Sequence, residues 1–269
     1  MNVVCVGDCG IDHYLPANQR RVGGISANFA RHARREFAAD DAIHLVSVVG
    51  DDDVAGPVLS ALQDTGIECH IRQLVGATPV QFIEVQADGE RHFVGYEAGV
   101  LRDFRLGDEE RRIIQYSDLL VAPVYLQIVG LFDELMSVGS AGLVAIDFAD
   151  FLQHPDFRLL EKHLQEIDIG FFGLTDDDDA TIGQIEQLAI RHDKLFVVTL
   201  GAGGSRAYCS AGRFECPAVA VARVVDTTGA GDAFAAGFLG KYCRGGCIQS
   251  ALQRAADLAS RVIQQQGAW

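Results

Sequence analysis

The sequence contains a glycine-rich stretch that reads Asp226-Thr227-Thr228-Gly229-Ala230-Gly231-Asp232-Ala233-Phe234. Small residues let a backbone approach an anion closely, and the first turn of a helix leaves N–H groups unpaired. We therefore expect a helix to begin here, with the amides of Gly229, Ala230 and Gly231 forming an anion hole for a transferring phosphoryl group. Asp232, in the same turn, is expected to accept the proton of an attacking hydroxyl. The alternative is an ordinary helix start, in which Asp232 only complements the helix dipole.

Outward from this stretch, short β-branched runs alternate with segments of helical period. Helices are predicted over 26–37, with Ser26 as N-cap, over 53–63, and over 229–242 and 247–265. Strands are predicted over 3–7, 43–49, 119–122, 143–148, 167–172 and 195–200. This β-α-β-α order predicts an α/β fold, a mostly parallel central sheet covered by helices on both faces.

One region departs from that order. Residues 80–87 alternate between apolar and polar, Asp88-Gly89 is a favourable hairpin turn, and residues 91–96 alternate again. A hairpin cannot simply join a sheet of parallel crossover units, so we expect it to form a small β-lid with the segment 12–22. Since no linker, repeat or second core is visible, we predict a single domain over residues 1–269, with lid segments at about 12–25 and 76–97.

Composition excludes several classes of function. Lys and Arg number 22 against 37 Asp and Glu, a net charge of −15, so binding to nucleic acid or to a membrane surface is not expected. The seven cysteines form no C-x-x-C pair and the histidines show no ligand spacing in the sequence, so we expect free thiols in a reducing cytoplasm and no zinc. The amino-terminal residues predict a first strand rather than a signal peptide.

The glycine-rich stretch resembles the second signature of the ribokinase, or PfkB, family of carbohydrate kinases. The first signature has a counterpart in Gly23-Gly24-Ile25-Ser26-Ala27-Asn28, and the order of motifs matches over essentially the whole chain. More narrowly, three segments resemble the fructoselysine 6-kinase branch of that family: Gly50-Asp51-Asp52-Asp53, residues 96–104, and Gln266-Gly267-Ala268-Trp269.

The resemblance implies a ribokinase-like three-layer α/β/α sandwich and an ATP-dependent kinase that phosphorylates a primary hydroxyl of a sugar or a sugar–amino acid adduct. Asp232 would be the catalytic base and Gly229 to Gly231 the anion hole. Asp12, Gly24 and Asn28 would bind sugar hydroxyls, and Tyr96 of the lid would contact the substrate. The nucleotide would lie against Thr199, Gly201, Gly204 and Thr228.

Taken alone, several of these residues have simpler explanations. Asp12 is as readily a loop cap, Asn28 a solvent-facing amide and Tyr96 part of a lid core. Two other functions stay open: another sugar kinase of the same family, acting on ribose, fructose or a keto-sugar acid, and a catalytically silent binding protein of this fold. A dinucleotide-binding oxidoreductase is disfavoured, because Gly7-Asp8-Cys9-Gly10 does not supply the required glycine pattern.

The expected metal is Mg²⁺. The family usually carries Asn-x-x-Glu near this point of the chain, whereas here Gly173 and Leu174 precede the acidic run at 176–179. Asp177 is our candidate for the magnesium network, because hard cations prefer oxygen ligands. A monovalent cation, K⁺, near Asp226 and Thr228 is a further expectation from the resemblance. The free edges of the lid suggest a homodimer formed through it.

Overall fold

The structure is a computed structural model, and it describes residues 1–15, 17–86, 89–151 and 157–269. Most strands belong to one nine-stranded sheet. In spatial order these strands are β13 (Gly212–Cys216), β12 (Ser205–Cys209), β11 (Leu195–Thr199), β10 (Ile169–Gly173), β9 (Leu143–Asp150), β8 (Leu119–Pro123), β1 (Asn2–Val6), β4 (Ala42–Val49) and β5 (Glu68–Gln73).

Pairing in the large sheet is parallel from β5 through to β11, whereas β12 pairs antiparallel with both of its neighbours, β11 and β13. The central strands are buried, as their continuous apolar sequences predict, because a parallel sheet is covered on both faces. The parallel strands end at one common edge of the sheet, which is where open α/β sheets present ligands. The predicted mostly parallel sheet is confirmed.

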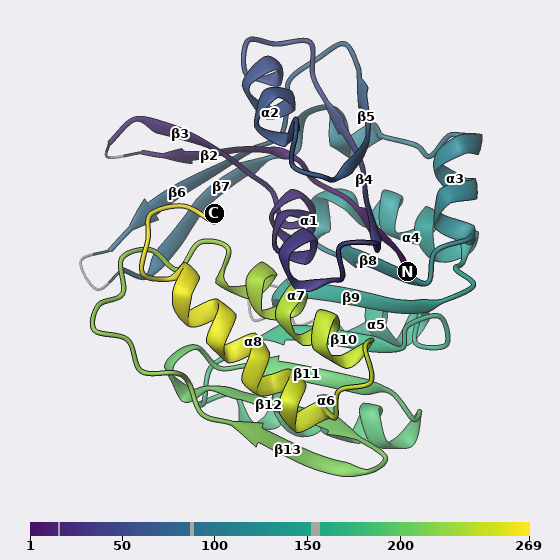
Figure 1. Ribbon diagram of the computed structural model, residues 1–269, viewed down its shortest axis with the longest axis vertical. Helices are drawn as coiled ribbons and strands as arrows, with labels where there is room; N and C mark the ends of the chain where they lie inside the picture. The colour runs from purple at the N-terminus through teal and green to yellow at the C-terminus, as the bar shows by residue number, and fades with distance from the viewer. Residues whose placement is uncertain (16, 87–88, 152–156) are drawn as a thin grey trace.

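Helices cover both faces of the sheet. They are α1 (Ile25–Glu36), α2 (Ala55–Leu62), α3 (Asp108–Gln115), α4 (Val129–Val138), α5 (Phe157–Lys162), α6 (Asp179–Arg191), α7 (Ala230–Tyr242) and α8 (Ile248–Val262), with short 3-10 helices η1 (Gly99–Asp103), η2 (Leu126–Ile128) and η4 (Gly201–Gly203). In Figure 1, α1, α7 and α8 lie in front of the sheet, and α3 to α6 contribute to the apolar cluster on its other face. The predicted three layers are confirmed.

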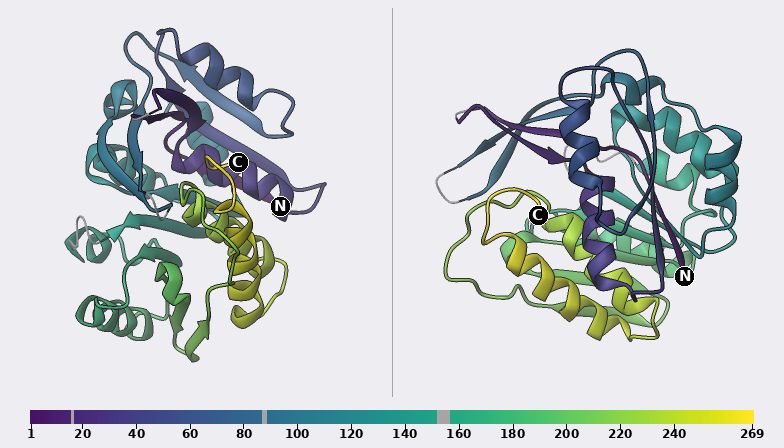
Figure 2. Two further views of the ribbon diagram at one scale, coloured as in Figure 1. Left: turned by 90° about the vertical axis from the view of Figure 1, so that its left-hand side faces the viewer. Right: turned by 45° about the horizontal axis from the view of Figure 1, so that its top comes forward.

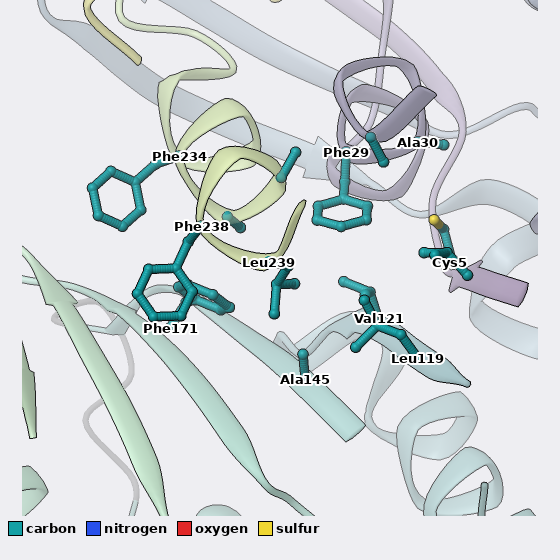
Figure 3. Close-up of a cluster of buried hydrophobic side chains, with 14 of the residues drawn as sticks. Cys5, Phe29, Ala30, Leu119, Val121, Ala145, Phe171, Phe234, Phe238 and Leu239 are labelled. Carbon is teal, nitrogen blue, oxygen red and sulfur yellow. The ribbon is translucent and has the colours of Figure 1, made fainter. Parts of the chain in front are cut away.

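Two apolar clusters hold these layers together. The cluster under α1, α7 and α8 contains Phe29, Phe171 and Phe238, and Figure 3 shows the Phe171 and Phe238 rings together and the Phe29 ring below α1, with Leu239 between them. The Phe171 and Phe238 rings meet edge to face with centroids 5.6 Å apart, a favourable aromatic geometry. On the opposite face, Phe148 and Phe172 stack with centroids 4.7 Å apart. Both helical layers are thereby fixed to the sheet.

A second, four-stranded sheet projects from this layered body, as the right-hand view of Figure 2 shows. We call it the lid sheet; its strands are, in spatial order, β3 (Gln19–Gly23), β2 (Gly10–Tyr14), β6 (Val80–Val85) and β7 (Arg91–Glu97). β6 and β7 form the predicted antiparallel pair, while the turn predicted at Asp88-Gly89 lies partly outside the described residues. The lid is larger than a hairpin, because β2 pairs parallel with β6.

The first helix begins differently from the prediction. Gly24, not Ser26, is the N-cap of α1, with a φ of 104° that favours glycine. The capping acceptor comes from Asp8, whose two carboxylate oxygens accept the N–H groups of Ile25 (3.1 Å) and Ser26 (3.2 Å). Ser26 was the wrong choice because the cap is supplied by a residue 17 positions away from Ile25 rather than by the local sequence.

None of the helices formed by the described residues is both long and apolar enough to cross a membrane.

Candidate active site

A large cavity of about 1410 Å³ lies between the lid sheet and the carboxyl edge of the large sheet. Twelve of the thirteen residues proposed from the sequence line it: Asp12, Gly24, Asn28, Tyr96, Thr199, Gly201, Gly204, Thr228, Gly229, Ala230, Gly231 and Asp232. They come from both ends of the chain and from its middle, so the fold brings together motifs that are up to 220 residues apart. Asp177 is the exception. It is exposed and does not line the cavity.

Asp232 lies buried in the first turn of α7, where it accepts a hydrogen bond of 2.8 Å from the side-chain amide of Asn28. The carbonyl oxygen of that amide accepts a hydrogen bond of 2.7 Å from the indole N–H of Trp269. Because an indole can only donate, the Trp269 contact fixes the orientation of the Asn28 amide and turns its NH₂ group toward Asp232. Trp269 is the C-terminal residue, and Figure 1 marks this end of the chain with C, near α1.

Four carboxyl groups meet the cavity at one end: Asp8, Asp12, Asp147 and Asp232. Burial raises the pKa of each, to about 7 for Asp12, to about 6 for Asp147, and well above the usual range for Asp232. Their mutual repulsion adds to this effect, since Asp147 raises the pKa of Asp232 and Asp8 raises that of Asp12. A carboxylate with a raised pKa is a stronger proton acceptor when ionised.

The positive charge of Arg91 opposes these shifts. Arg91, at the start of β7, lines the cavity, and its charge partly lowers the pKa values of Asp12, Asp147 and Asp232 that burial raises. Its guanidinium donates a hydrogen bond of 2.8 Å to the backbone carbonyl of Thr227 and lies 4.8 Å from the centre of the Phe93 ring. The lid sheet is therefore joined to the loop that precedes α7.

Glycine is suited to positions 229 and 231 at the start of α7 for two different structural reasons. Gly229 has a φ of 77°, and a Cβ there would lie 2.5 Å from the Cβ of Ala268. A Cβ at Gly231, in contrast, would meet open space, so this position leaves room beside the first turn of α7. Since a helix start offers unpaired N–H groups and positive dipole character, the open space at Gly231 suits an anionic group.

Asp226 connects three parts of the chain below this helix start. One carboxylate oxygen accepts the N–H of Thr228 (2.9 Å); the other accepts the hydroxyl of Tyr14 in the lid sheet (2.8 Å) and the N–H of Gly267 (2.8 Å). Burial raises the pKa of Asp226, but the hydrogen bonds from Thr228, Gly267 and Tyr14 outweigh it and lower the pKa overall. Asp226 is thus an ionised structural anchor.

At the other end of the cavity, η4 follows β11; it begins at one glycine with positive φ and is capped at its end by another. These are Gly201 (54°) and Gly204 (89°), and a Cβ at Gly204 would lie 2.3 Å from the carbonyl oxygen of Cys216. Ser205, which also lines the cavity, has a buried hydroxyl oxygen without a hydrogen-bond partner. Buried hydroxyls in a protein normally have partners, so that of Ser205 fits a polar ligand that would supply one.

Tyr96 of β7 reaches across the cavity wall to Tyr125. Their hydroxyls are 2.9 Å apart and their rings meet edge to face with centroids 5.3 Å apart. Burial raises the pKa of both phenols, so both are neutral donors. Tyr96 therefore packs within the lid, as the simpler explanation of this residue predicts, and also lines the cavity.

Sequence reasoning did not identify Asp147, Arg91, Tyr125 or Trp269. A signal existed for Asp147, which lies toward the carboxyl end of a predicted buried strand, where such sheets place their ligands. Arg91 opens the second strand of the predicted hairpin, but the face it presents depends on pairing. For Tyr125 and Trp269 no local pattern indicates a role, since their partners are distant in the sequence.

Several known proteins are similar to this chain. Residues 149–269 match the family described as pfkB family carbohydrate kinase. The chain is 31% identical over 265 residues to fructoselysine 6-kinase of Shigella flexneri, covering 98% of both chains. It is 26% identical over 303 residues to 2-dehydro-3-deoxygluconokinase of Dickeya dadantii, covering 99% of this chain and 96% of that protein.

Its fold is similar to the crystal structure of the nucleoside kinase of Methanocaldococcus jannaschii, an archaeal member of the ribokinase family. The TM-score is 0.79 at 19% identity, with 99% of this chain and 93% of that chain covered. This likeness confirms the predicted ribokinase-like fold, and the full-length similarity to curated carbohydrate kinases fixes the class of reaction. The chain is a phosphotransferase and belongs to the pfkB family of carbohydrate kinases.

Proposed function

We propose that this kinase transfers the γ-phosphoryl group of ATP to the C6 hydroxyl of a sugar–amino acid adduct of the fructoselysine type. The observation that carries the proposal is the hydrogen bond between Asn28 and Asp232 at the open first turn of α7. It joins the residue expected to hold the sugar to the residue expected to take its proton, within one cavity.

In the proposed reaction, the sugar hydroxyl oxygen attacks the γ-phosphorus and its proton passes to the Asp232 carboxylate. The bond between the γ-phosphorus and the bridging oxygen breaks, and its electron pair remains on the departing ADP. The amides of Gly229, Ala230 and Gly231 stabilise the charge on the transferring group. Asp12, Gly24 and Asn28 orient the sugar, and the lid sheet excludes water that would otherwise compete as acceptor.

The residues present fit ATP. The nucleotide would lie against Thr199, Gly201 and Gly204, with Thr228 closer to the phosphates. The buried hydroxyl of Ser205 lacks a partner, as expected of a group that a bound nucleotide would satisfy.

For magnesium, Asp147 is a better candidate than Asp177. Asp147 lines the cavity beside Asp232, whereas Asp177 is exposed and outside it. A carboxylate oxygen is the ligand type that Mg²⁺ prefers. When bound, the ion would supply positive charge to the phosphoryl oxygens. A K⁺ ion near Asp226 has less support, because the two oxygens of that carboxylate already accept three hydrogen bonds.

The amino-acid part of the substrate would project toward the lid sheet. The lid carries the acidic residues Glu84, Glu90 and Glu97, and of these three only Glu90 lines the cavity. A carboxylate there favours the cationic amine of a lysine adduct. This assignment also follows the similarity to fructoselysine 6-kinase over 98% of the chain.

A keto-sugar acid is the second candidate substrate, because the cavity does contain a basic group. Arg91 lines it near Asp12 and would pair with a substrate carboxylate. The similarity to 2-dehydro-3-deoxygluconokinase points the same way at lower identity.

A substrate panel separates these candidates. ADP release would be measured with fructoselysine, fructosylglycine, 2-dehydro-3-deoxygluconate, fructose and ribose, and compared as kcat/KM. We expect fructoselysine to give the highest value and ³¹P NMR to locate the phosphate on C6. A higher value for 2-dehydro-3-deoxygluconate would replace the proposal with the second candidate, and no sugar-dependent release across the panel would favour a silent binding protein.

We also propose that the chain dimerises through the lid sheet. Within that sheet, β3 and β7 are the two edge strands, and Val94 of β7 is 50% exposed. Edge strands of this kind pair readily between subunits. A monomeric mass by light scattering at micromolar concentration would contradict this proposal.

A further inference from the structure

A cluster of three potential metal ligands lies on the outer strands of the large sheet, away from the cavity. It consists of His44 on β4 and of Glu68 and His70 on the edge strand β5. In the parallel register His44 lies opposite Glu68, and Val46 lies opposite His70. Because side chains alternate along a strand, Glu68 and His70 point to the same face while Cys69 between them points to the other. None of the three lines the cavity.

The donor atoms of the cluster already converge. Nδ1 of His44 lies 3.2 Å from Nε2 of His70 and 3.5 Å from a carboxylate oxygen of Glu68. All three donor atoms lie within 4.8 Å of one another. In a tetrahedral zinc site, with metal–donor distances of about 2.0–2.2 Å, neighbouring donor atoms are about 3.3–3.6 Å apart. The separations of His44 Nδ1 from His70 Nε2 (3.2 Å) and from the Glu68 oxygen (3.5 Å) are therefore close to the donor separations of such a site before any ion is added.

We propose that His44, Glu68 and His70 bind one divalent transition-metal ion, of which zinc is the best fit. Two imidazoles and a carboxylate are a ligand set that suits Zn²⁺ and its neighbours in the transition series, rather than Mg²⁺ or Ca²⁺. The His44 side chain is 14% exposed and the Glu68 side chain 60% exposed, so the site is anchored on its inner side and open to solvent on its outer side. The fourth position would be taken by water.

No local pattern in the sequence indicates this site, because its ligands come from two strands: His44 on one, and Glu68, 24 residues later, on the next. Strand pairing alone brings them together. Metal binding would stabilise the edge of the large sheet. β5 is the outermost strand and is mostly exposed, and a shared ion would link it to β4. A ligand that binds only the folded state raises its stability.

The simplest competing explanation is a hydrogen bond between two neutral imidazoles with no metal. In the structure the rings are stacked at 29° with centroids 5.4 Å apart, and one ring nitrogen would donate to the other. This arrangement predicts no saturable metal binding, so the two accounts differ in a direct measurement.

The test uses the untagged full-length protein after removal of metals with a chelator, and titrates it with Zn²⁺ in competition with a chromogenic chelator. We expect one equivalent of Zn²⁺ to bind with micromolar affinity or better and to raise Tm. His70→Asn and Glu68→Gln should each weaken binding at least tenfold, and the exposed Glu68 position guards against a variant that fails to fold. His92→Asn, an exposed histidine on the lid sheet, is the matched control and should leave binding unchanged.

Cobalt provides a second readout, because the absorption of bound Co²⁺ reports coordination number and the presence of thiolate ligands. A tetrahedral spectrum without thiolate charge transfer is expected. The proposal is overturned if the wild-type protein binds no zinc, if the His70 and Glu68 variants bind it as well as the His92 variant does, or if cobalt binds through a cysteine. Each of these outcomes is independent of kinase activity.

Discussion

Asp12→Asn is the substitution whose effect on stability can be worked out most fully from the structure. Burial raises the pKa of Asp12 to about 7 from its ordinary value of 3.8, and the nearby charges of Asp8 and Asp226 add to the effect. The folded protein thus holds this proton more tightly than the unfolded chain does. The associated stability is fully present below pH 3.8 and is lost as the pH rises through about 7. An amide of the same shape has no proton to lose.

The size of the effect follows from the same two pKa values. Each pKa unit corresponds to about 1.36 kcal/mol, so ionised Asp12 costs the folded state about 4 kcal/mol at pH 8. At pH 5 the cost is about 1.7 kcal/mol, because folded Asp12 keeps its proton there and the pH is only about 1.2 units above the ordinary pKa of 3.8. The difference between Asp12→Asn and the wild type should therefore grow by about 2–3 kcal/mol between pH 5 and pH 8, a large part of the stability of a typical domain.

The assay is urea unfolding of both proteins at pH 5 and pH 8, without nucleotide or sugar. Other buried carboxyl groups titrate in both proteins and largely cancel in the comparison. Asp103→Asn, at an exposed position at the end of η1, is the matched control and should show no pH-dependent difference. If the gap between Asp12→Asn and the wild type stays constant, or narrows, as the pH rises, the reasoning from burial is wrong.

Three further substitutions test the proposed site. Asp232→Asn should lower kcat by about 10²-fold or more while ATP affinity is retained, and undiminished turnover would show that Asp232 is not the base. Because burial raises the pKa of this carboxyl group, the variant should also unfold at a higher temperature than the wild type at pH 8. Trp269→Phe deletes the donor to Asn28, and a hydrogen bond worth about 1 kcal/mol implies an approximately five-fold loss in kcat/KM. Glu90→Gln should raise KM about two- to five-fold for fructoselysine and leave fructosylglycine unaffected, whereas Glu97→Gln, outside the cavity, should alter neither. Equal effects of the two glutamate substitutions would argue against a cationic substrate contact.

The sequence was most informative where structure is local. The buried run at Leu195–Thr199 and the helix that starts after Gly229 follow from apolar patterning and glycine placement, and both are found in the structure. Most of the cavity residues were predicted from the resemblance to the family, and the convergence of chain segments at the carboxyl edge of a parallel sheet supported that prediction. What could not be predicted depends on contacts between distant segments. Asp8, rather than Ser26, accepts the free N–H groups at the start of α1. Only the pairing of β2 with β6 in the folded protein makes the lid a four-stranded sheet.

Asp177 illustrates a different limit. An acidic run after a strand resembles a metal site in one dimension, but the run here turns outward: Asp178 bonds to Thr175, and Asp176 pairs with Arg206. Asp147, on a neighbouring strand, has the position in the cavity that the run lacks. Residue type indicated the chemistry, whereas only the direction of the chain after the strand decides which carboxylate reaches the cavity.

The hydrogen bond from Asn28 to Asp232 joins residues 204 positions apart, and the bond from Tyr14 to Asp226 joins residues 212 apart. Contacts of such long range form late, because the loops between them must first be closed. During refolding, helices and neighbouring strand pairs should therefore recover before enzymatic activity does. The same arrangement predicts that a chain still emerging from the ribosome, before α7 is made, lacks Asp232, the proposed base, and therefore has no kinase activity.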